Sequence, residues 1–444
     1  MSKKKNLIIV VEIKKRELAS KLLLSTMAIK KKFRVFIANA ESYFWASNNN
    51  IIPKGILFLK SIEHKDLSYL RQYKNQNAHI VCLDEEGGQL RSSIANFFKQ
   101  RVSDESLSFV SSFYNWGKLD YNYSKKHYLR HNKKFKLTGS PRIDLLNPKL
   151  EYIFEDKVKE LKKKYKKYVL ICTNFGLSNS HYTDKEKIKI ETKNRRFKKN
   201  SEINWLKKYM KEERKLMFKF IDLCNYLSNH YKNLNFVFRP HPAENISTYN
   251  KHIFNKNVII ENDGNAIDWI KGSIAHIHNG CTTGFESFAL KKKVFSYEPF
   301  KIKFIDNITS NKISYRIKNK KDFLNNIFES KKINFTNKKK RNIFNYRYKF
   351  SDNFNSYEII KNLNELKIQK ADFKYKLRPY LIKRLLQFIQ YKVFDYKFKS
   401  KYYKEKNKLV QKNEIINFFK KNKKMSKIKI NKLIEGLFCI ESKY

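Results

Sequence analysis

The stretch IAHIHNGCTTGFESFAL, residues 274–290, joins a short apolar run to a helical segment through a glycine turn. The run IAHIH is typical of a buried strand, and Gly280 allows the chain to turn tightly before the helix begins. A strand that leads directly into a helix is the repeating unit of parallel α/β sheets. This stretch therefore predicts an α/β fold, with a polar turn at the carboxyl end of one strand.

The same alternation of apolar runs and helical segments continues on both sides of this stretch. Runs rich in Val, Ile, Leu and Phe with helices between them indicate parallel sheets that are covered on both faces. We expect a charged helix near 151–167, an insertion loop near 176–200 and a long helix near 202–231. The expected strands are 7–13, 34–40, 55–61, 79–85, 114–117, 136–139, 168–174, 235–238, 257–262, 274–280 and 293–299.

A chain of 444 residues is longer than a single hydrophobic core usually supports. The two series of strands predict two Rossmann-like, doubly wound domains, over residues 1–148 and 149–345. From about 331 the composition shifts to Lys, Tyr, Phe and Asn, and residues 346–444 are predicted to form a basic, aromatic-rich helical extension.

The formal net charge of +55 invites a nucleic-acid interpretation. However, only 16 of the 96 basic residues are Arg, which nucleic-acid proteins favour for bidentate contacts. The abundance of Lys, Asn and Ile fits drift toward AT-rich codons, and no zinc-finger or RNA-recognition pattern is present. We therefore expect no nucleic-acid partner.

The five cysteines are dispersed and form no C-x-x-C pair, as in a protein whose thiols stay reduced. No apolar run approaches the ~20 residues of a membrane span. These features predict a cytoplasmic protein, with any membrane contact peripheral and on the inner face of the plasma membrane.

The motif Arg239-Pro240-His241-Pro242 directly follows the expected strand NFVF. The carboxyl ends of parallel strands face the crevice in which open α/β sheets bind ligands. Arg239 offers a forked donor suited to phosphate, and the prolines hold His241 at a set position. His241 could donate a hydrogen bond to a phosphate oxygen as a leaving nucleotide gains charge. The alternative is a rigid loop with a solvated histidine.

The turn after the strand at 274–280 is the second candidate. His278 and Gly280 lead into the helix, where the hydroxyls of Thr282 and Thr283 and the free N–H groups could receive a phosphate. Glu286 lies one turn further in, within reach of ribose hydroxyls. The alternative is an ordinary helix capped by Thr282 or Thr283, which is compatible with phosphate binding.

The third candidate is Asp84-Glu85-Glu86-Gly87-Gly88, at the end of the expected strand HIVCL. Adjacent carboxylates repel one another, which raises the pKa of at least one and makes it a candidate general base. The alternative is a solvated acidic turn. Asp84 and Glu86 could instead hold a metal, but no Asp-x-Asp motif is present, so we expect no metal. No G-x-G-x-x-G follows the first strand, so no nicotinamide cofactor is expected.

Five motifs occur in the order in which they recur in the bacterial surface carbohydrate biosynthesis proteins, a GT-B-type group. They are VE-x-K-x-REL (11–18), DEEGG (84–88), TG-x-PR-x-DLL (138–146), RPHP-x-E (239–244) and H-x-GCTTGFES (278–287). The chain resembles this group over residues 6–300. The resemblance implies a glycosyltransferase-like enzyme of capsule or lipopolysaccharide assembly, whose first domain faces the acceptor and whose second binds a nucleotide sugar in the crevice between them.

A more distant likeness is to the bacterial sialyltransferases and Kdo transferases that use CMP-sugars. It implies inverting, metal-independent transfer from a CMP-sugar to a glycan or lipid-linked glycan acceptor, without a cofactor. The likeness places the catalytic base at Glu85 or Glu86, and Asp84 leaves the choice between them open. The catalytic HP motif falls on His241, and the hydroxyls at a helix start fall on Thr282 and Thr283. With Arg239, His278, Gly280 and Glu286, which their positions at strand ends suggest, these threonines complete the expected nucleotide-sugar site.

Three alternatives stay open at this stage: an enzyme like the UDP-GlcNAc 2-epimerases, a CDP-glycerol-type polymer transferase, and a non-catalytic scaffold at the membrane. Residues 374–430 interleave Lys and Arg with Tyr, Phe, Leu and Ile. This pattern suits a helix that lies on an anionic membrane. It equally suits a helix that packs on the N-terminal domain.

Overall fold

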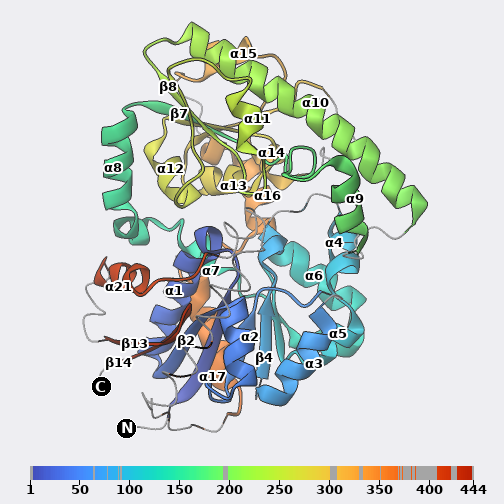
Figure 1. The fold of residues 1–444 in the computed structure, drawn as a ribbon, viewed down its shortest axis with the longest axis vertical. Coiled ribbons are helices and arrows are strands. Elements are labelled where there is room, and N and C mark those ends of the chain that lie inside the picture. Colours follow the sequence, from blue (N-terminus) through green and yellow to red (C-terminus); the bar gives the residue numbers. More distant parts are fainter. Residues whose placement is uncertain are drawn as a thin grey trace. The chain divides into compact units, whose positions relative to one another are not determined.

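The computed structural model of the chain describes residues 4–63, 66–77, 79–88, 90, 93–193, 199–300, 308–329, 334–350, 352–368, 370, 373, 382, 386, 408–421 and 428–442. The chain forms two compact units, each built around its own sheet (Figure 1). Unit 1 comprises residues 1–87, 101–153 and 348–444, and unit 2 comprises residues 88–100 and 154–347.

The sheet of unit 1 contains six parallel strands in the order β2-β1-β3-β4-β5-β6. The order changes direction at β1, so the topological switch point lies at the carboxyl ends of β1 and β3, where open α/β sheets bind ligands. These strands are β1 (Lys5–Val11), β2 (Phe33–Asn39), β3 (Ile56–Leu59), β4 (His79–Leu83), β5 (Ser112–Tyr114) and β6 (Phe135–Lys136).

Helices follow these strands along the chain, as the sequence predicted. The first is α1 (Lys14–Lys30), whose leucines are buried and which packs against α7 and α17. The other helices of unit 1 are α2 (Ala40–Asn48), α3 (Leu67–Gln76), α5 (Asp104–Phe109), α6 (Lys118–His127), α7 (Pro141–Asp144), α17 (Asn355–Glu365) and α21 (Lys412–Lys421). Helix α4 (Ile94–Arg101) belongs to unit 2 except for its last residue.

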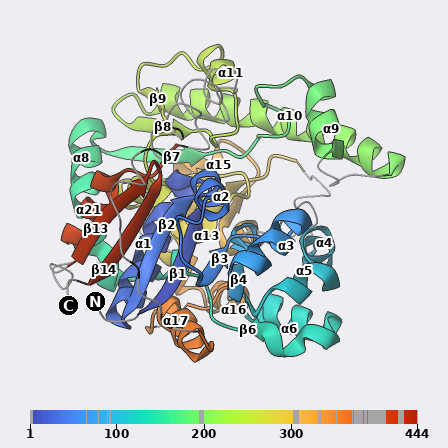
Figure 2. The same ribbon diagram turned by 60° about the horizontal axis from the view of Figure 1, so that its bottom comes forward.

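The C-terminal segment adds a hairpin to the sheet of unit 1. Strands β13 (Ile428–Ile434) and β14 (Leu437–Ser442) are antiparallel, and β14 pairs with β2 (Figure 2). The buried Arg34 links this hairpin to β2, because its Nε donates a hydrogen bond to the Glu441 carboxylate at 3.2 Å. The expectation of a helical extension over 346–444 was therefore wrong for this part. Within 374–430, for which a basic amphipathic helix was expected, the described residues are Ile382, Leu386, 408–421 and 428–430, and they include α21.

The sheet of unit 2 contains six parallel strands in the order β12-β11-β10-β7-β8-β9. Counted from β7, this is the Rossmann order 3-2-1-4-5-6, and its switch point lies between β7 and β10. The strands are β7 (Tyr168–Cys172), β8 (Asn235–Arg239), β9 (Val258–Ile260), β10 (Ala275–His278), β11 (Lys293–Tyr297) and β12 (Tyr315–Ile317).

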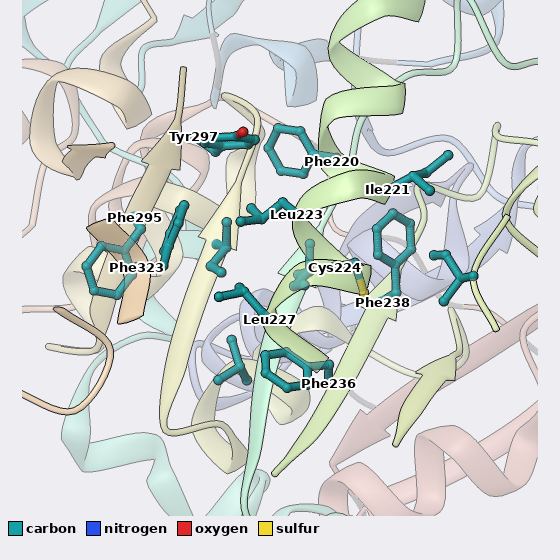
Figure 3. Close-up of a cluster of buried hydrophobic side chains, with 14 of the residues drawn as sticks. Phe220, Ile221, Leu223, Cys224, Leu227, Phe236, Phe238, Phe295, Tyr297 and Phe323 are labelled. Carbon is teal, nitrogen blue, oxygen red and sulfur yellow. The ribbon is translucent and has the colours of Figure 1, made fainter. Parts of the chain in front are cut away.

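Alternate residues of β7 pack into two separate cores, one on each face of the sheet. Val169 and Ile171 join a cluster with the long helix α10, shown in Figure 3, whereas Leu170 and Cys172 join a cluster with α8 and α12. Helices therefore cover both faces, and the predicted doubly wound fold is confirmed. The helices are α8 (Glu155–Tyr165), α9 (Asp184–Lys193), α10 (Asn200–His230), α11 (Ile246–Asn250), α12 (Ala266–Gly272), α13 (Thr282–Ala289), α14 (Thr309–Ile313), α15 (Asp322–Asn326) and α16 (Lys338–Arg347).

Helix α9 lies within the stretch 176–200, which the sequence suggested to be a loop. Its start is stabilised by Thr183 and Glu186, whose side chains each accept a hydrogen bond from the other residue's backbone N–H. This is the reciprocal arrangement of a capping box. Across the described part of the chain, no helix combines the length and the apolar character needed to span a membrane.

Candidate functional site

The topology of unit 2 brings two of the predicted motifs to one edge of its sheet. Arg239, Cys172 and His278 are register partners on the adjacent strands β8, β7 and β10. The loop that contains His241 and the turn at Gly280 therefore leave the same edge, on either side of β7. Since neighbouring strands lie about 4.8 Å apart, these two segments start roughly 10 Å from each other. That spacing suits a phosphate or a ribose.

The His241 side chain is exposed, and a backbone N–H two residues further along the chain fixes the orientation of its ring. Nδ1 of His241 accepts a hydrogen bond from the backbone N–H of Ala243 at 3.1 Å. In the neutral ring, the hydrogen must then be on Nε2. His241 is therefore a hydrogen-bond donor through Nε2, as contact with a phosphate oxygen would require.

Glu244 holds the His241 loop from below. Its buried carboxyl group accepts hydrogen bonds from the His241 backbone N–H at 2.7 Å and from the Thr173 hydroxyl at 3.0 Å, and also contacts the Tyr249 hydroxyl. Burial raises the pKa of Glu244 to about 7, although these hydrogen bonds act in the opposite direction. One acid thus ties the end of β7 and helix α11 to the loop. Glu244 is the last residue of the motif RPHP-x-E, but its supporting role could not be predicted from the sequence.

Arg239 is engaged in holding a neighbouring loop. Its two Nη atoms donate to the backbone carbonyls of Asp263 and Gly264, both at 2.7 Å, and its guanidinium lies 5.6 Å from the centre of the Trp269 ring. The side chain is buried, and burial lowers its pKa. The phosphate contact predicted for Arg239 has no support in this geometry, because the forked donor is used within the unit.

The predicted contact of His278 with a nucleotide is wrong, because the side chain is completely buried. Nδ1 accepts the backbone N–H of Gly280 at 2.8 Å, and Nε2 lies 2.8 Å from the Ser314 hydroxyl. Burial lowers the pKa of His278 to about 3, so the ring is neutral. A Cβ at Gly284 would lie 2.6 Å from its Nε2, which shows how closely α13 packs on it. His278 supports the turn and the helix from beneath.

The turn itself has the features expected of an anion-binding helix start. Gly280 has a φ of +88°, which favours glycine, and Cys281 occupies the N-cap position without a side-chain cap bond. The alternative of a Thr282 or Thr283 cap is therefore wrong. The Thr283 hydroxyl lies 2.6 Å from the Cys281 sulfur and 3.2 Å from a nitrogen of the buried His276. Thr282 is half-buried in the first turn.

Glu286 differs from these residues in its exposure. Only 5% of its surface is exposed, so it belongs to the buried side of α13. The ribose contact that the sequence suggested for Glu286 is thus not supported. Two of the predicted nucleotide-sugar residues, Thr282 and Thr283, are accessible at this edge of the unit 2 sheet. Gly280 gives the turn before them its shape.

The acidic motif lies at the carboxyl end of β4 in unit 1, close to the switch point of that sheet. Asp84 is buried and accepts from Arg101 Nε at 2.8 Å and from the Glu86 backbone N–H at 3.0 Å. Its pKa is raised, mainly by burial and only slightly by the neighbouring carboxylates, and Arg101 opposes the rise. Asp84 therefore fixes the turn.

Glu85 and Glu86 have opposite environments although they are neighbours. Glu85 is buried and pairs with the equally buried Lys21 at 2.9 Å. Burial alone would raise its pKa, but the charges of Lys21 and Arg142 hold the pKa below its usual range. The Glu86 side chain is 46% exposed and pairs with Arg16 at 2.8 Å, and this charge lowers its pKa. Glu86 is thus the acid that a ligand can reach.

Further charges surround Glu86 at this edge. Glu12, just after β1, pairs with Lys60, just after β3, and Arg16 also contacts the buried Glu17 at 3.5 Å. Arg16 and Glu17 belong to the motif VE-x-K-x-REL, but nothing in the sequence indicated the buried partner Lys21, which lies well inside α1. Among the residues that the structure describes, no group of His, Cys, Asp or Glu could hold a metal ion. That the edges of the two units line one crevice stays a prediction.

No family model matches this sequence, and no curated protein matches it either. Many solved structures are similar, among them three that are each 12% identical to this chain. UDP-GlcNAc 2-epimerase from Methanocaldococcus jannaschii has a TM-score of 0.48, and the match covers 81% of this chain and 99% of the epimerase chain. A putative UDP-N-acetylglucosamine 2-epimerase from Listeria monocytogenes has a TM-score of 0.49, and the match covers 84% of this chain and 100% of the Listeria chain. A variant of the wall teichoic acid polymerase TagF soaked with CDPG has a TM-score of 0.49, and the match covers 81% of this chain and 88% of the TagF chain. TM-scores below 0.5 identify neither an activity nor a ligand for this chain.

Proposed function

We propose that this chain is a glycosyltransferase-like enzyme of bacterial surface polysaccharide assembly. Unit 2 would bind a nucleotide sugar, with a CMP-sugar as the first choice, and unit 1 would supply the base for a hydroxyl of a glycan or lipid-linked glycan. One observation carries the proposal: the His241 loop and the start of α13 flank the switch point of a Rossmann-ordered sheet.

The donor phosphate has two sets of hydrogen-bond donors at this edge. The first-turn N–H groups of α13, at Thr282 and Thr283, point out of the helix start and favour an anion. The Nε2–H of His241 can donate to the same phosphate as the sugar–oxygen bond breaks and the leaving nucleotide gains charge. These donors balance the charge without a metal, in keeping with metal-independent transfer.

We assign the base to Glu86 and a supporting role to Glu85. Glu86 is exposed, and Arg16 lowers its pKa and keeps it ionised at neutral pH. Because a lowered pKa weakens a carboxylate as a base, the acceptor hydroxyl would have to displace Arg16 before Glu86 accepts its proton. That hydroxyl oxygen would attack the anomeric carbon from the face opposite the nucleotide, which inverts its configuration. The buried Lys21–Glu85 pair holds the turn in which Glu86 lies.

Comparison of Glu86→Gln with Glu85→Gln tests this assignment. Loss of the base typically slows transfer about 10²–10⁴-fold and leaves nucleotide affinity intact, so Glu86→Gln should have this effect at an unchanged melting temperature. Glu85→Gln leaves Lys21 buried and uncompensated, so it should lower the melting temperature instead. Wild-type transfer rates in Glu86→Gln would refute the assignment.

Product analysis separates the enzyme classes. The full-length protein is incubated with a CMP-sugar and a glycan acceptor, with UDP-GlcNAc, and with CDP-glycerol. A new glycosidic linkage from the CMP-sugar supports the proposal. Isomerisation of UDP-GlcNAc, or polymer formation from CDP-glycerol, would replace it with the corresponding enzyme class, and an absence of any product would favour the scaffold.

A further inference from the structure

A row of aromatic rings lies on α2 and α3 of unit 1. Phe44 meets the edge of Tyr69 with ring centres 5.7 Å apart, Tyr69 stacks on Tyr73 at 6.3 Å, and Tyr73 meets Tyr43 at 5.1 Å. Phe44 and Tyr69 are 36% and 47% exposed, whereas Tyr43 is buried. Single exposed rings are ordinary, but a continuous row that runs from the surface inward needs an explanation.

The inner end of this row forms one wall of a cavity of about 160 Å³. Hydroxyl and amide groups make up most of its lining, from Tyr43, Ser47, Asn50, Asn75, Gln76 and Asn77. The cavity lies beside the residues that precede β3 and β4, so it is at the amino edge of the sheet. Asp84 and Glu86 are at the opposite, carboxyl edge, and the cavity is therefore separate from the site proposed above.

The charge of this cavity is unusual for the chain. Charged residues make up 31% of the sequence, and the net charge is +55. Lys54 is nevertheless the one charged residue in the lining. An anionic ligand would find a single cation there, and a cationic ligand would find no partner. Neutral amides and hydroxyls supply donors and acceptors together, which suits a neutral ligand with many hydroxyl groups.

The inner polar groups are already arranged by hydrogen bonds to one another. The Ser47 hydroxyl donates to Gln76 Oε1 at 2.5 Å, and Asn77 Nδ2 donates to the Tyr43 hydroxyl at 2.8 Å. The outer residues Asn50 and Asn75 are exposed, and their side chains make no hydrogen bond within the described residues. The cavity thus has rigid inner walls and an outer rim with two available amides.

We propose that this aromatic row and cavity bind a neutral segment of a glycan. The faces of sugar rings carry C–H groups that pack on aromatic rings, and Phe44 and Tyr69 present such rings to solvent. Sugar hydroxyls bond to the amides of Asn50 and Asn75 at the rim. A growing polysaccharide would be held here at a distance from the acidic edge. The proposal goes beyond the transfer activity, because binding alone can be measured.

Isothermal titration of the full-length protein with chitotetraose and maltoheptaose, both neutral, tests the proposal. At least one oligosaccharide should bind, with equal affinity in about 0.15 M and about 0.5 M NaCl, because no charge is involved. Phe44→Ala and Tyr69→Ala should each weaken binding about three- to tenfold. Tyr357→Ala is the matched control, since Tyr357 is also 47% exposed in unit 1. Thermal unfolding checks that each variant is folded.

Two results would overturn the proposal: no binding of either oligosaccharide at about 10 mM, or binding that both Phe44→Ala and Tyr69→Ala leave unchanged. Affinity that falls with added salt would also contradict it, because it would indicate attraction to the basic surface. Nucleotide binding to unit 2 is measured separately, so either result can fail while the other holds.

Discussion

Replacement of Glu244 by Gln should change how the stability of the protein depends on pH. Glu244 is 1% exposed and joins the end of β7, the His241 loop and α11 through its carboxyl oxygens. Its pKa is raised from an ordinary 4.5 to about 7, because burial disfavours the charged form. Gln resembles the protonated acid in shape and hydrogen-bonding capacity, and it cannot ionise.

The size of the effect follows from the pKa difference. The folded state favours the protonated acid, so Glu244 contributes its full stability below about pH 4.5, and this contribution is lost as the pH rises to about 7. A difference of about 2.5 pKa units corresponds to roughly 3 kcal/mol. The free energy of unfolding of the wild type relative to Glu244→Gln should therefore fall by roughly 3 kcal/mol between pH 4.5 and pH 8.

Urea unfolding of both proteins across this pH range measures the difference directly. Subtraction of the two curves removes the contribution of every other titrating group. Glu160→Gln serves as the control, because the Glu160 side chain is 60% exposed on α8, and its curve should run parallel to that of the wild type. A constant difference between wild type and Glu244→Gln at all pH values would show that Glu244 does not titrate between the folded and unfolded states as its burial requires.

Three other perturbations test separate parts of the account. Lys21→Met leaves the buried Glu85 without its counter-ion and should cost about 3–5 kcal/mol in urea unfolding; an unchanged free energy would show that the pair is not structural. His278→Ala should lower the melting temperature, because it removes a fully buried ring that is hydrogen-bonded at both nitrogens. His241→Ala should leave the melting temperature unchanged and slow transfer about 10²–10³-fold. The reverse pattern would exchange the roles of the two histidines. Replacement of residues 374–407 by a linker of about eight Gly and Ser residues should preserve the fold. The flanking residues Phe373 and Val410 both contact β2, and a linker of this length can span up to about 26 Å. The same change should reduce sedimentation with anionic vesicles, and undiminished binding would exclude this segment as a membrane anchor.

Most of the fold could be predicted from the sequence because the strands are buried on both faces and form apolar runs. The exceptions have identifiable causes. The strand β12 has the exposed Arg316 at its centre and is followed by a Lys-rich stretch, so no apolar run marks it in the sequence. Helix α9 was hidden by its charged composition, although its capping pair was present in the sequence. The hairpin β13–β14 has a turn signal at Glu435-Gly436, where Gly436 has a φ of +67°, but the surrounding Lys-rich composition suggested a helix.

The candidate site was predictable in position but not in detail. Motifs at strand ends placed His241 and Thr282 on one edge, because register and topology follow from the order of the strands. The direction of a side chain at a strand end does not follow from spacing alone. His278 therefore looked like a ligand contact, yet it lies under α13, and Arg239 holds a loop. Partners such as Lys21 come from packing and leave no pattern in the sequence.

Titration of CMP, CDP and UDP into the full-length protein measures whether the His241 edge of unit 2 binds a nucleotide. CMP should bind most tightly, and His241→Ala should weaken its binding about ten- to a hundredfold, the usual effect of losing a hydrogen bond to a charged group. His252→Ala is the control, because His252 is an exposed histidine of the same unit. A preference for UDP or CDP would contradict the CMP-sugar assignment. Failure of all three nucleotides to bind, or equal affinity in His241→Ala, would contradict the claim that this edge of unit 2 is a nucleotide-sugar site.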